Sequence, residues 1–538
     1  MPKLITSSRS GFAVRAMACG FIVALAACAP PGPTRSPAAE RLVPCDEAYP
    51  IDQTAADPAS PGPGPWRHVF CVQVTLARTE GWEDPVQAIV LSNQATDPLS
   101  GREAIVYHPG GPGFSVVRRT TSAPPALDPD KYVVIAWDGN TAGGPSGLCG
   151  PAEITFLTER TPESYADLAS QVGAQCRFGF GSPADVGAWA AAEELEAVRD
   201  SLGVDRFTLL TQSYGTAIAE AYLALHPEHV RRAVLDAPIG LDISWIDRVS
   251  ATRWTLERAA NDLARSCRGE RCRAVTEATP ADATYRTLRQ AILAAHPRVG
   301  SGSLELTPVM LDEATLLTLG AGRFRDGYAE AVEEALGGDA TMLWRIGERS
   351  YLDLDRAAYY RSICADLQRP DSEAGYLVGD DPLLFAFVSG FAPCVAFPHG
   401  QPRTPSSPPV AASAPDVLIV ASTDDPFSPE SMIRRSSALA KLGSICVTHV
   451  VGHTSYSAAV VRELVDRFIA GEFSEAISKE CAALEGAGGA PGRGQTRPSG
   501  RRRGIDAGAQ ENPGNTRRAG PDLVSSHSPA GRVISVAQ

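Results

Sequence analysis

The chain is predicted to form an α/β fold, in which a mostly parallel, doubly wound sheet is interrupted by an inserted helical cap. Two observations predict it. Short apolar runs typical of buried strands alternate with amphipathic helical segments in residues 67–240 and again in residues 392–482. Between these two parts, in residues 241–391, helical periodicity dominates. With 538 residues, 44% of them hydrophobic, the chain can bury a large core.

The first part of the core opens with short strands, and its longest helix ends at Gly203, a usual stop signal. In chain order, the expected elements are strands Val69–Leu76, Ala88–Leu91, Ala104–Tyr107 and Tyr132–Ala136, helix Ala188–Leu202, strand Arg206–Leu210, helix Thr216–Leu225 and strand Ala233–Leu235. Parallel neighbours need a long crossover, usually a helix, so this alternation predicts a parallel sheet.

Helical periodicity marks the cap, and alternation of strands and helices returns in the C-terminal part of the core. The clearest helices expected in the cap are Trp254–Arg265, Ala281–Ala295 and Tyr328–Leu336. After the cap, the expected elements are strand Asp416–Ala421, helix Ser431–Leu442, strand Ile445–Val451 and helix Ser457–Ile469. One core is therefore expected to be split by one insertion.

The N-terminal segment is typical of an export signal. Basic residues precede an apolar run that is too short to span a bilayer. The end of this run, followed by Cys28, resembles a bacterial lipobox. Residues 1–27 are therefore predicted to be a lipoprotein signal peptide, Cys28 the lipid-anchored residue and residues 28–66 a Pro-rich tether. An ordinary secretory signal is the alternative, and both place the chain in the bacterial cell envelope or outside the cell.

Export changes how the cysteines are interpreted. Beyond Cys19 and Cys28, ten cysteines remain, and an even number in an oxidising compartment predicts disulfides. Neighbour-to-neighbour pairing would join Cys45–Cys71, Cys149–Cys176, Cys267–Cys272, Cys364–Cys394 and Cys446–Cys481, although other connectivities stay open. Without a CxxC pair and with scattered histidines, no metal site is expected.

Charge separates the C-terminal segment from the rest of the chain. The net charge of −13 argues against nucleic acid as a partner. From Ala487 onward, eight Arg and three acidic residues give a local net charge of +5. Residues 483–538, rich in Gly, Pro and Ser, are predicted to be a disordered basic tail. Such a tail either touches anionic envelope polymers or is an extension without function.

The most informative stretch is Thr208–Thr216, where a strand, a sharp turn and a helix place Ser213 at the apex of the turn. This is the setting of a nucleophile elbow, in which the helix directs its N-terminal dipole at the serine. A serine hydroxyl needs a base, and an acid that orients the base. In the α/β-hydrolase fold the three follow in the order Ser, Asp, His. The chain is therefore predicted to have this fold, with Ser213 as nucleophile.

His453 and Asp425 are the predicted base and acid. His453 is the only histidine that lies beside a glycine just after the last strand. Asp425 starts an Asp-Pro-Phe-Ser-Pro turn after strand Asp416–Ala421, and Asp424 stays open as the alternative acid.

The oxyanion hole is expected to use two backbone donors. One is the N–H of Tyr214, directly after the nucleophile. The other lies in the Gly/Pro-rich loop after strand Ala104–Tyr107, where the sequence does not choose between Gly110 and Gly111.

Together these motifs resemble the secreted tripeptidyl aminopeptidase and proline iminopeptidase group of α/β-hydrolases, from about Cys71 to Cys481. The matching segments are Pro109–Gly113, Asp138–Cys149, Ser213–Thr216, Val234–Asp236, Ile363–Asp366, Cys394–Pro398 and Asp425–Pro429. The resemblance implies a serine exopeptidase that requires no cofactor. Its cap would close around the free N-terminus of a peptide substrate, and Ser213 would form an acyl-enzyme.

Three segments depart from the pattern of this group. Thr211 stands where the group has Gly, Asn140-Thr141 where it has Arg-Gly, and Gly452-His453-Thr454 where it has Gly-His-Gly. Two alternatives therefore stay open. One is an esterase or lipase-like acyl hydrolase with the same triad. The other is a non-catalytic surface lipoprotein on a hydrolase scaffold.

Overall fold

The computed structural model describes residues 42–45, 66–77, 83–142, 149–161, 163–176, 185–321, 325–352, 354–367, 381–397, 415–472 and 475–487. The predicted signal peptide, the lipidation site Cys28, and most of the predicted tether and tail lie outside these residues. In the described part of the chain, no helix is long and apolar enough to cross a membrane.

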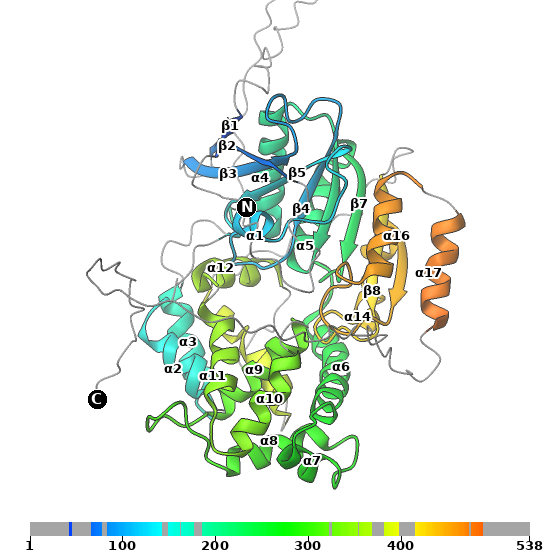
Figure 1. Cartoon of the computed structure of the whole chain (residues 1–538). Coiled ribbons are helices and arrows are strands. Elements are labelled where there is room, and N and C mark those ends of the chain that lie inside the picture. The colour runs from blue at the N-terminus through cyan, green and yellow to red at the C-terminus, as the bar shows by residue number, and fades with distance from the viewer. Residues whose placement is uncertain are drawn as a thin grey trace, which may run out of the picture. The chain divides into compact units, whose positions relative to one another are not determined.

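A nine-stranded sheet in the order β1-β2-β3-β5-β4-β6-β7-β8-β9 forms the core (Figure 1). The strands are β1 (Val43–Pro44), β2 (His68–Ala77), β3 (Glu83–Ser92), β4 (Glu103–His108), β5 (Tyr132–Asp138), β6 (Phe207–Gln212), β7 (Val230–Asp236), β8 (Asp416–Ser422) and β9 (Ser444–Thr448). All neighbours from β5 to β9 are parallel, whereas β1, β2 and β3 pair antiparallel and β3 also runs antiparallel to β5. The predicted mostly parallel sheet is confirmed.

Helices cover both faces of the sheet, because successive side chains of a strand point to opposite sides. On β5, Ile135 faces the layer formed by α4 and α5, and Val134 faces the layer formed by α1, α16 and α17. The core helices are α1 (Val116–Ser122), α4 (Gly187–Leu202), α5 (Tyr214–Leu225), the 3₁₀ helix η4 (Pro227–His229), α14 (Glu430–Ile433), α15 (Leu439–Leu442), α16 (Ala459–Ile469) and α17 (Glu475–Ala487). Helix α17 runs past residue 483, where the tail was predicted to begin.

The cap is built from two segments of the chain rather than one. The inserted segment contains α6 (Trp245–Arg265), α7 (Glu270–Thr276), α8 (Thr284–Ala294), α9 (Pro308–Gly320), α10 (Arg325–Leu336), α11 (Thr341–Leu352), α12 (Arg356–Asp366), α13 (Pro382–Ser389) and the 3₁₀ helix η7 (Ala392–Ala396). Helices α2 (Pro151–Glu159) and α3 (Tyr165–Cys176) precede the elbow but lie beside these helices (Figure 1). A Cβ on Gly173 of α3 would lie 2.3 Å from the carbonyl oxygen of Pro393 in η7.

The helix predicted at Ser431–Leu442 is wrong in its middle, where the structure has only the short helices α14 and α15. The carboxylate of Asp242 lies between them. It accepts hydrogen bonds from the Ser436 Oγ (2.5 Å), the Ser437 Oγ (3.1 Å) and the Ala438 N–H (3.0 Å). These bonds replace the backbone hydrogen bonds that a continuous helix would form here. Serine side chains also disfavour a helix interior, because they form hydrogen bonds with nearby backbone groups.

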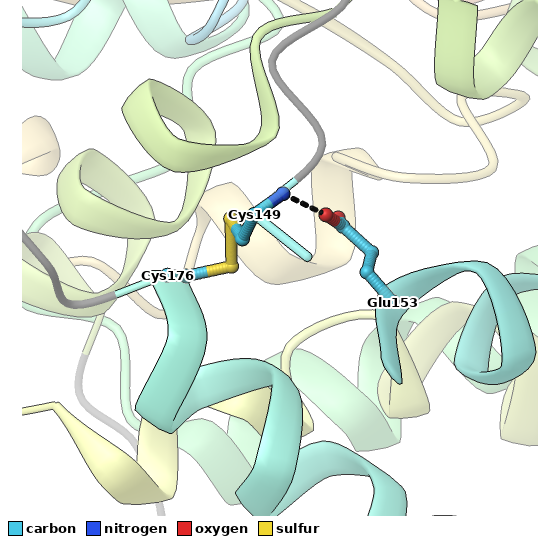
Figure 2. A group of neighbouring side chains, drawn as sticks. All are labelled: Cys149, Glu153 and Cys176. Carbon is cyan, nitrogen blue, oxygen red and sulfur yellow. Dashed lines mark hydrogen bonds between the residues drawn. A yellow bond between two sulfur atoms is a disulfide. The ribbon is translucent and has the colours of Figure 1, made fainter. Parts of the chain in front are cut away.

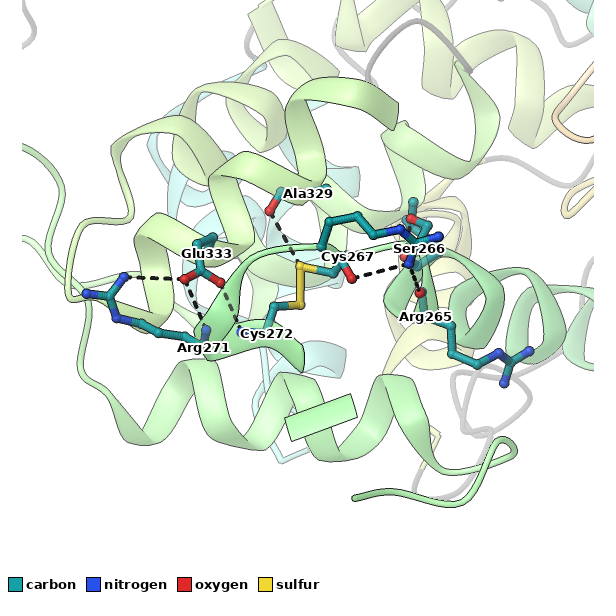
Figure 3. The surroundings of a disulfide bond; sticks show 9 residues. Arg265, Ser266, Cys267, Arg271, Cys272, Ala329 and Glu333 are labelled. Atoms are coloured by element: carbon teal, nitrogen blue, oxygen red, sulfur yellow. Dashed lines mark hydrogen bonds and ion pairs between the residues drawn. A yellow bond between two sulfur atoms is a disulfide. The ribbon is translucent and has the colours of Figure 1, made fainter. Parts of the chain in front are cut away.

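Five disulfides join the neighbouring cysteine pairs named above. Figure 2 shows Cys149–Cys176, which links the start of α2 to the end of α3; the Cys149 N–H also donates to Glu153 Oε2 at 2.6 Å. Figure 3 shows Cys267–Cys272, which closes the connection between α6 and α7 beside α10. These two disulfides therefore brace the cap.

Candidate active site

Ser213 stands at the turn between β6 and α5, with φ 50° and ψ −126°. A non-glycine residue in such a conformation costs ~1–3 kcal/mol, and it persists only where its surroundings hold it. The Ser213 N–H donates to the Asp236 carbonyl oxygen (2.9 Å), which anchors the turn to β7. The strained turn presents the Ser213 Oγ to His453 Nε2 at 2.6 Å. This is the geometry of a nucleophile elbow.

His453 lies between Ser213 and Asp425. Its Nδ1 is 2.9 Å from Asp425 Oδ2 and 3.1 Å from Oδ1, so Nδ1–H donates to the carboxylate and Nε2 is left to accept the serine proton. Asp425 is only 1% exposed, and its Oδ1 accepts the N–H groups of Phe427 (2.8 Å) and Ser428 (3.0 Å). Burial acts to lower the pKa of His453, but the charge and hydrogen bond of Asp425 outweigh it, so this pKa is raised.

Asp424, the alternative acid, faces the cap instead of the histidine. Its Oδ1 lies 2.6 Å from the guanidinium Nη2 of Arg258 on α6. The structure therefore brings Asp425, and not Asp424, against His453.

Two backbone donors are available beside the nucleophile. Tyr214 is the first residue of α5, so its N–H has no carbonyl partner within the helix. The Gly110 N–H donates to His108 Nδ1 (3.2 Å), whereas the Gly111 N–H has no partner among the residues described. Gly110 instead allows close approach, since a Cβ there would lie 2.9 Å from the Ser213 Cβ. The geometry favours Tyr214 and Gly111 as the oxyanion donors.

His108 holds this loop in place. It is buried, and burial lowers its pKa to about 3, so the imidazole is neutral and its Nδ1 accepts from Gly110. Its ring also packs edge-on against Trp137 of β5. In the sequence, His108 was noted only as part of a Gly/Pro-rich loop. Its position at the end of β4 could have indicated that it holds this loop in place.

A second buried carboxylate, Asp236 at the end of β7, positions the loop that carries His453. It accepts the N–H groups of Ser455 and Tyr456, each at 2.9 Å, and the Gln212 Nε2 at 3.0 Å. These bonds join the histidine loop to the last residue of β6, directly before Ser213. Sequence reasoning missed this role, because Asp236 looked like the end of an ordinary strand.

Two of the residues that depart from the family pattern are held by hydrogen bonds. The Thr211 Oγ1 donates to the Val234 carbonyl oxygen at 3.0 Å. The Asn140 side chain donates to Glu194 at 3.0 Å and accepts the Gly187 N–H at 2.8 Å. Thr211 therefore links β6 to β7, and Asn140 links the end of β5 to α4.

The cap touches both catalytic loops. The His453 N–H donates to the Gly320 carbonyl oxygen at the end of α9 (3.2 Å), and the Asp355 N–H donates to the Gly113 carbonyl oxygen (2.8 Å). The Tyr214 hydroxyl donates to the buried Asp366 at the end of α12. Burial raises the pKa of Asp366 to about 7, although the bonds from Tyr214 and Ala188 oppose the shift.

A row of aromatic rings leads from His453 into the cap. Phe427 packs edge-on against His453 with ring centroids 5.5 Å apart, and stacks on Phe387 of α13 at 5.6 Å. Phe391 and Trp245 continue the row, at 5.3 Å and 5.9 Å. We call these four residues the aromatic row.

Comparison with known proteins agrees with this geometry. The chain is 24% identical to the serine protease Hip1 of Mycobacterium tuberculosis over 370 residues, which cover 61% of this chain and 70% of that protein. It is 30% identical to a tripeptidyl aminopeptidase of Streptomyces lividans over 152 residues, which cover 25% and 28%. It is also 26% identical to carboxylesterase B of Mycobacterium tuberculosis over 376 residues, which cover 62% and 71%.

The predicted resemblance to the tripeptidyl aminopeptidase group is therefore confirmed at low identity, with an esterase also among the relatives. Residues 103–452 match the family described as the α/β hydrolase fold, and this match spans more than half of the chain. The chain belongs to the α/β hydrolase fold family.

Proposed function

We propose that this protein is an exported serine exopeptidase that releases single residues or short peptides from the free N-terminus of a peptide. The observation that supports it is the contact of the cap with both catalytic loops, through Gly320 and Asp355. A long chain crossing the site would need open space on both sides of Ser213. A chain end needs space on one side only. The relative named as a serine protease supports peptide cleavage, and the relative named as a tripeptidyl aminopeptidase supports cleavage at the N-terminal end.

The reaction would proceed through an acyl-enzyme. The Ser213 Oγ attacks the scissile carbonyl carbon while His453 Nε2 takes the hydroxyl proton. The N–H groups of Tyr214 and Gly111 stabilise the oxyanion, and Asp425 stabilises the imidazolium. His453 then protonates the leaving amine. Water, deprotonated by His453, attacks the ester and releases the N-terminal fragment with a new carboxylate.

An esterase is the second candidate, and the aromatic row favours it. The row is apolar from Phe427, which packs against His453, to Trp245, and apolar contacts suit an acyl chain as well as a peptide side chain. The relative named carboxylesterase B supports the same alternative.

Matched amide and ester reporters separate the two candidates. Aminoacyl and tripeptidyl amides, each with a free or an acetylated N-terminus, and a short-chain acyl ester would be offered to the wild type and to Ser213→Ala. Ser100→Ala, in an exposed turn, is the control. We expect cleavage of the free-amine reporters by the wild type and the control only. Equal cleavage of acetylated reporters would refute recognition of the N-terminus, and cleavage of esters alone would favour the esterase.

Export on a lipid anchor is a further part of the proposal, supported by the resemblance of residues 25–28 to a lipobox and by the five disulfides. Mass analysis of the mature N-terminus tests it in a bacterial host. We expect a diacylglyceryl group on Cys28 and membrane release in Cys28→Ser. An unmodified mature terminus would show an ordinary secretory signal.

A further inference from the structure

We propose that Glu196, His226 and His229 form a zinc-binding site on the core, independent of the proposed function. One ligand atom from each residue lies within 4.8 Å of the others. Glu196 belongs to α4, His226 caps the C-terminus of α5 and His229 lies in η4. Helix α5 has 12 residues, so ~18 Å of helix separate this cluster from Ser213 at its other end.

The distance between Glu196 and His229 suits tetrahedral zinc, and His226 lies within 4.8 Å of both. Imidazole nitrogen and carboxylate oxygen bind zinc at ~2.0–2.2 Å, which places the ligand atoms roughly 3.3–3.5 Å apart. His229 Nδ1 lies 3.1 Å from Glu196 Oε2, and His226 Nε2 lies 3.3 Å from Glu193 Oε2. On binding, the ring proton of each histidine would sit on the nitrogen that faces away from zinc, so both imidazoles bind in the neutral form. The ligand set is therefore two imidazoles and one carboxylate, and solvent would complete the coordination.

The side chains of the site are already held in position without the metal. The Tyr222 hydroxyl donates to Glu196 Oε2 at 2.8 Å, which holds the carboxylate between the helices. The two histidine rings are nearly parallel, with 10° between their planes. The side chains of His226, His229 and Glu196 are 19%, 26% and 20% exposed, so solvent metal ions can reach them while most of each side chain stays packed.

The local charge attracts a cation despite one arginine. Arg199 donates to both oxygens of Glu196, from Nη2 to Oε1 at 2.8 Å and from Nε to Oε2 at 2.9 Å, and zinc would have to displace the second bond. Glu193 and Asp200, the latter 3.9 Å from Arg199, add two more negative charges.

A zinc ion bound here would crosslink the C-terminal end of α5 to α4. The two helices pack on one face of the sheet, and the cluster lies at the end of α5 that is far from Ser213. We therefore expect the metal to change the stability of the fold and not the rate of the reaction. Ligands that bind only the folded state raise its melting temperature with concentration.

The test measures zinc binding to the folded, disulfide-bonded protein without a histidine tag, at pH 7.5. Calorimetric titration with zinc chloride should show one equivalent of zinc bound. Thermal unfolding in the presence of zinc chloride should show a higher melting temperature than without it. The His226→Ala/His229→Ala variant should bind at least 100-fold more weakly and lose the thermal shift. His296→Ala is the matched control, since His296 is 75% exposed and paired with Glu305 elsewhere.

Circular dichroism of the double variant shows whether it is folded. Failure of the wild type to bind zinc would overturn the proposal, as would equal binding by the double variant. Should the double variant not fold, the single variants His226→Gln and His229→Gln replace it, and both must weaken binding. None of these outcomes depends on which substrate the catalytic site prefers.

Discussion

Asp425 and Asp424 are neighbours in the chain, and the structure assigns them opposite roles. Asp425 accepts the Nδ1–H of His453, whereas Asp424 pairs with Arg258 of the cap. Replacing each by Asn keeps the size of the side chain and removes its charge. The two variants therefore form a matched pair that tests which carboxylate orients the catalytic histidine.

The expected losses differ in size. In Asp425→Asn the imidazolium loses its counter-charge, and the amide NH₂ favours the wrong tautomer of His453. Such a change lowers kcat by roughly 10²–10⁴-fold, or ~3–5 kcal/mol in the activation barrier. Asp424→Asn breaks an ion pair whose side chains are 28% and 50% exposed, so only ~0.2–1 kcal/mol of stability is at stake.

Steady-state hydrolysis of an activated ester measures both variants, because this readout does not depend on peptidase or esterase preference. Thermal unfolding followed by circular dichroism is the control for folding. We expect Asp425→Asn to fold and to lose at least about 100-fold in kcat, with Asp424→Asn close to the wild type. Equal losses, or a larger loss in Asp424→Asn, would refute the assignment.

Three other expectations concern pH, the oxyanion residue and a disulfide. Because His453 must be neutral to accept a proton and its pKa is raised, kcat/KM should fall on the acid side with an apparent pKa above ~6.5; a lower value in a pH profile contradicts this. Tyr214→Phe removes the donor to buried Asp366, so thermal melts should show a loss of ~1–3 kcal/mol, while kcat changes little. Replacing Cys446 and Cys481 by Ala should cost ~2–5 kcal/mol in urea unfolding, and an unchanged midpoint would contradict it.

Local pattern accounts for most of the fold and for the triad. The order of strands and helices is set by periodicity and stop signals, which act over a few residues. Ser213 could be recognised because strand, turn and helix around it are local features. His453 could be recognised because it follows the last strand. The ends of parallel strands meet at one edge of a sheet, so their order along the chain predicts their meeting in space.

The tertiary structure decided what depends on contacts between distant segments. Nothing local separates Asp424 from Asp425, because their roles depend on where Arg258 and His453 lie. The helices α2 and α3 have ordinary helical periodicity, and only their packing partners assign them to the cap.

The same reason applies to the buried carboxylates and to the proposed metal site. Asp236 and Asp366 gain their roles from N–H and O–H donors far along the chain. The sequence predicted no metal site, because His226 and His229 form no zinc motif until the packing of α4 against α5 brings Glu196 to them. The spacing of residues in the sequence tells which of them are neighbours within one helix or strand. Clusters of residues from different elements form only when those elements pack together.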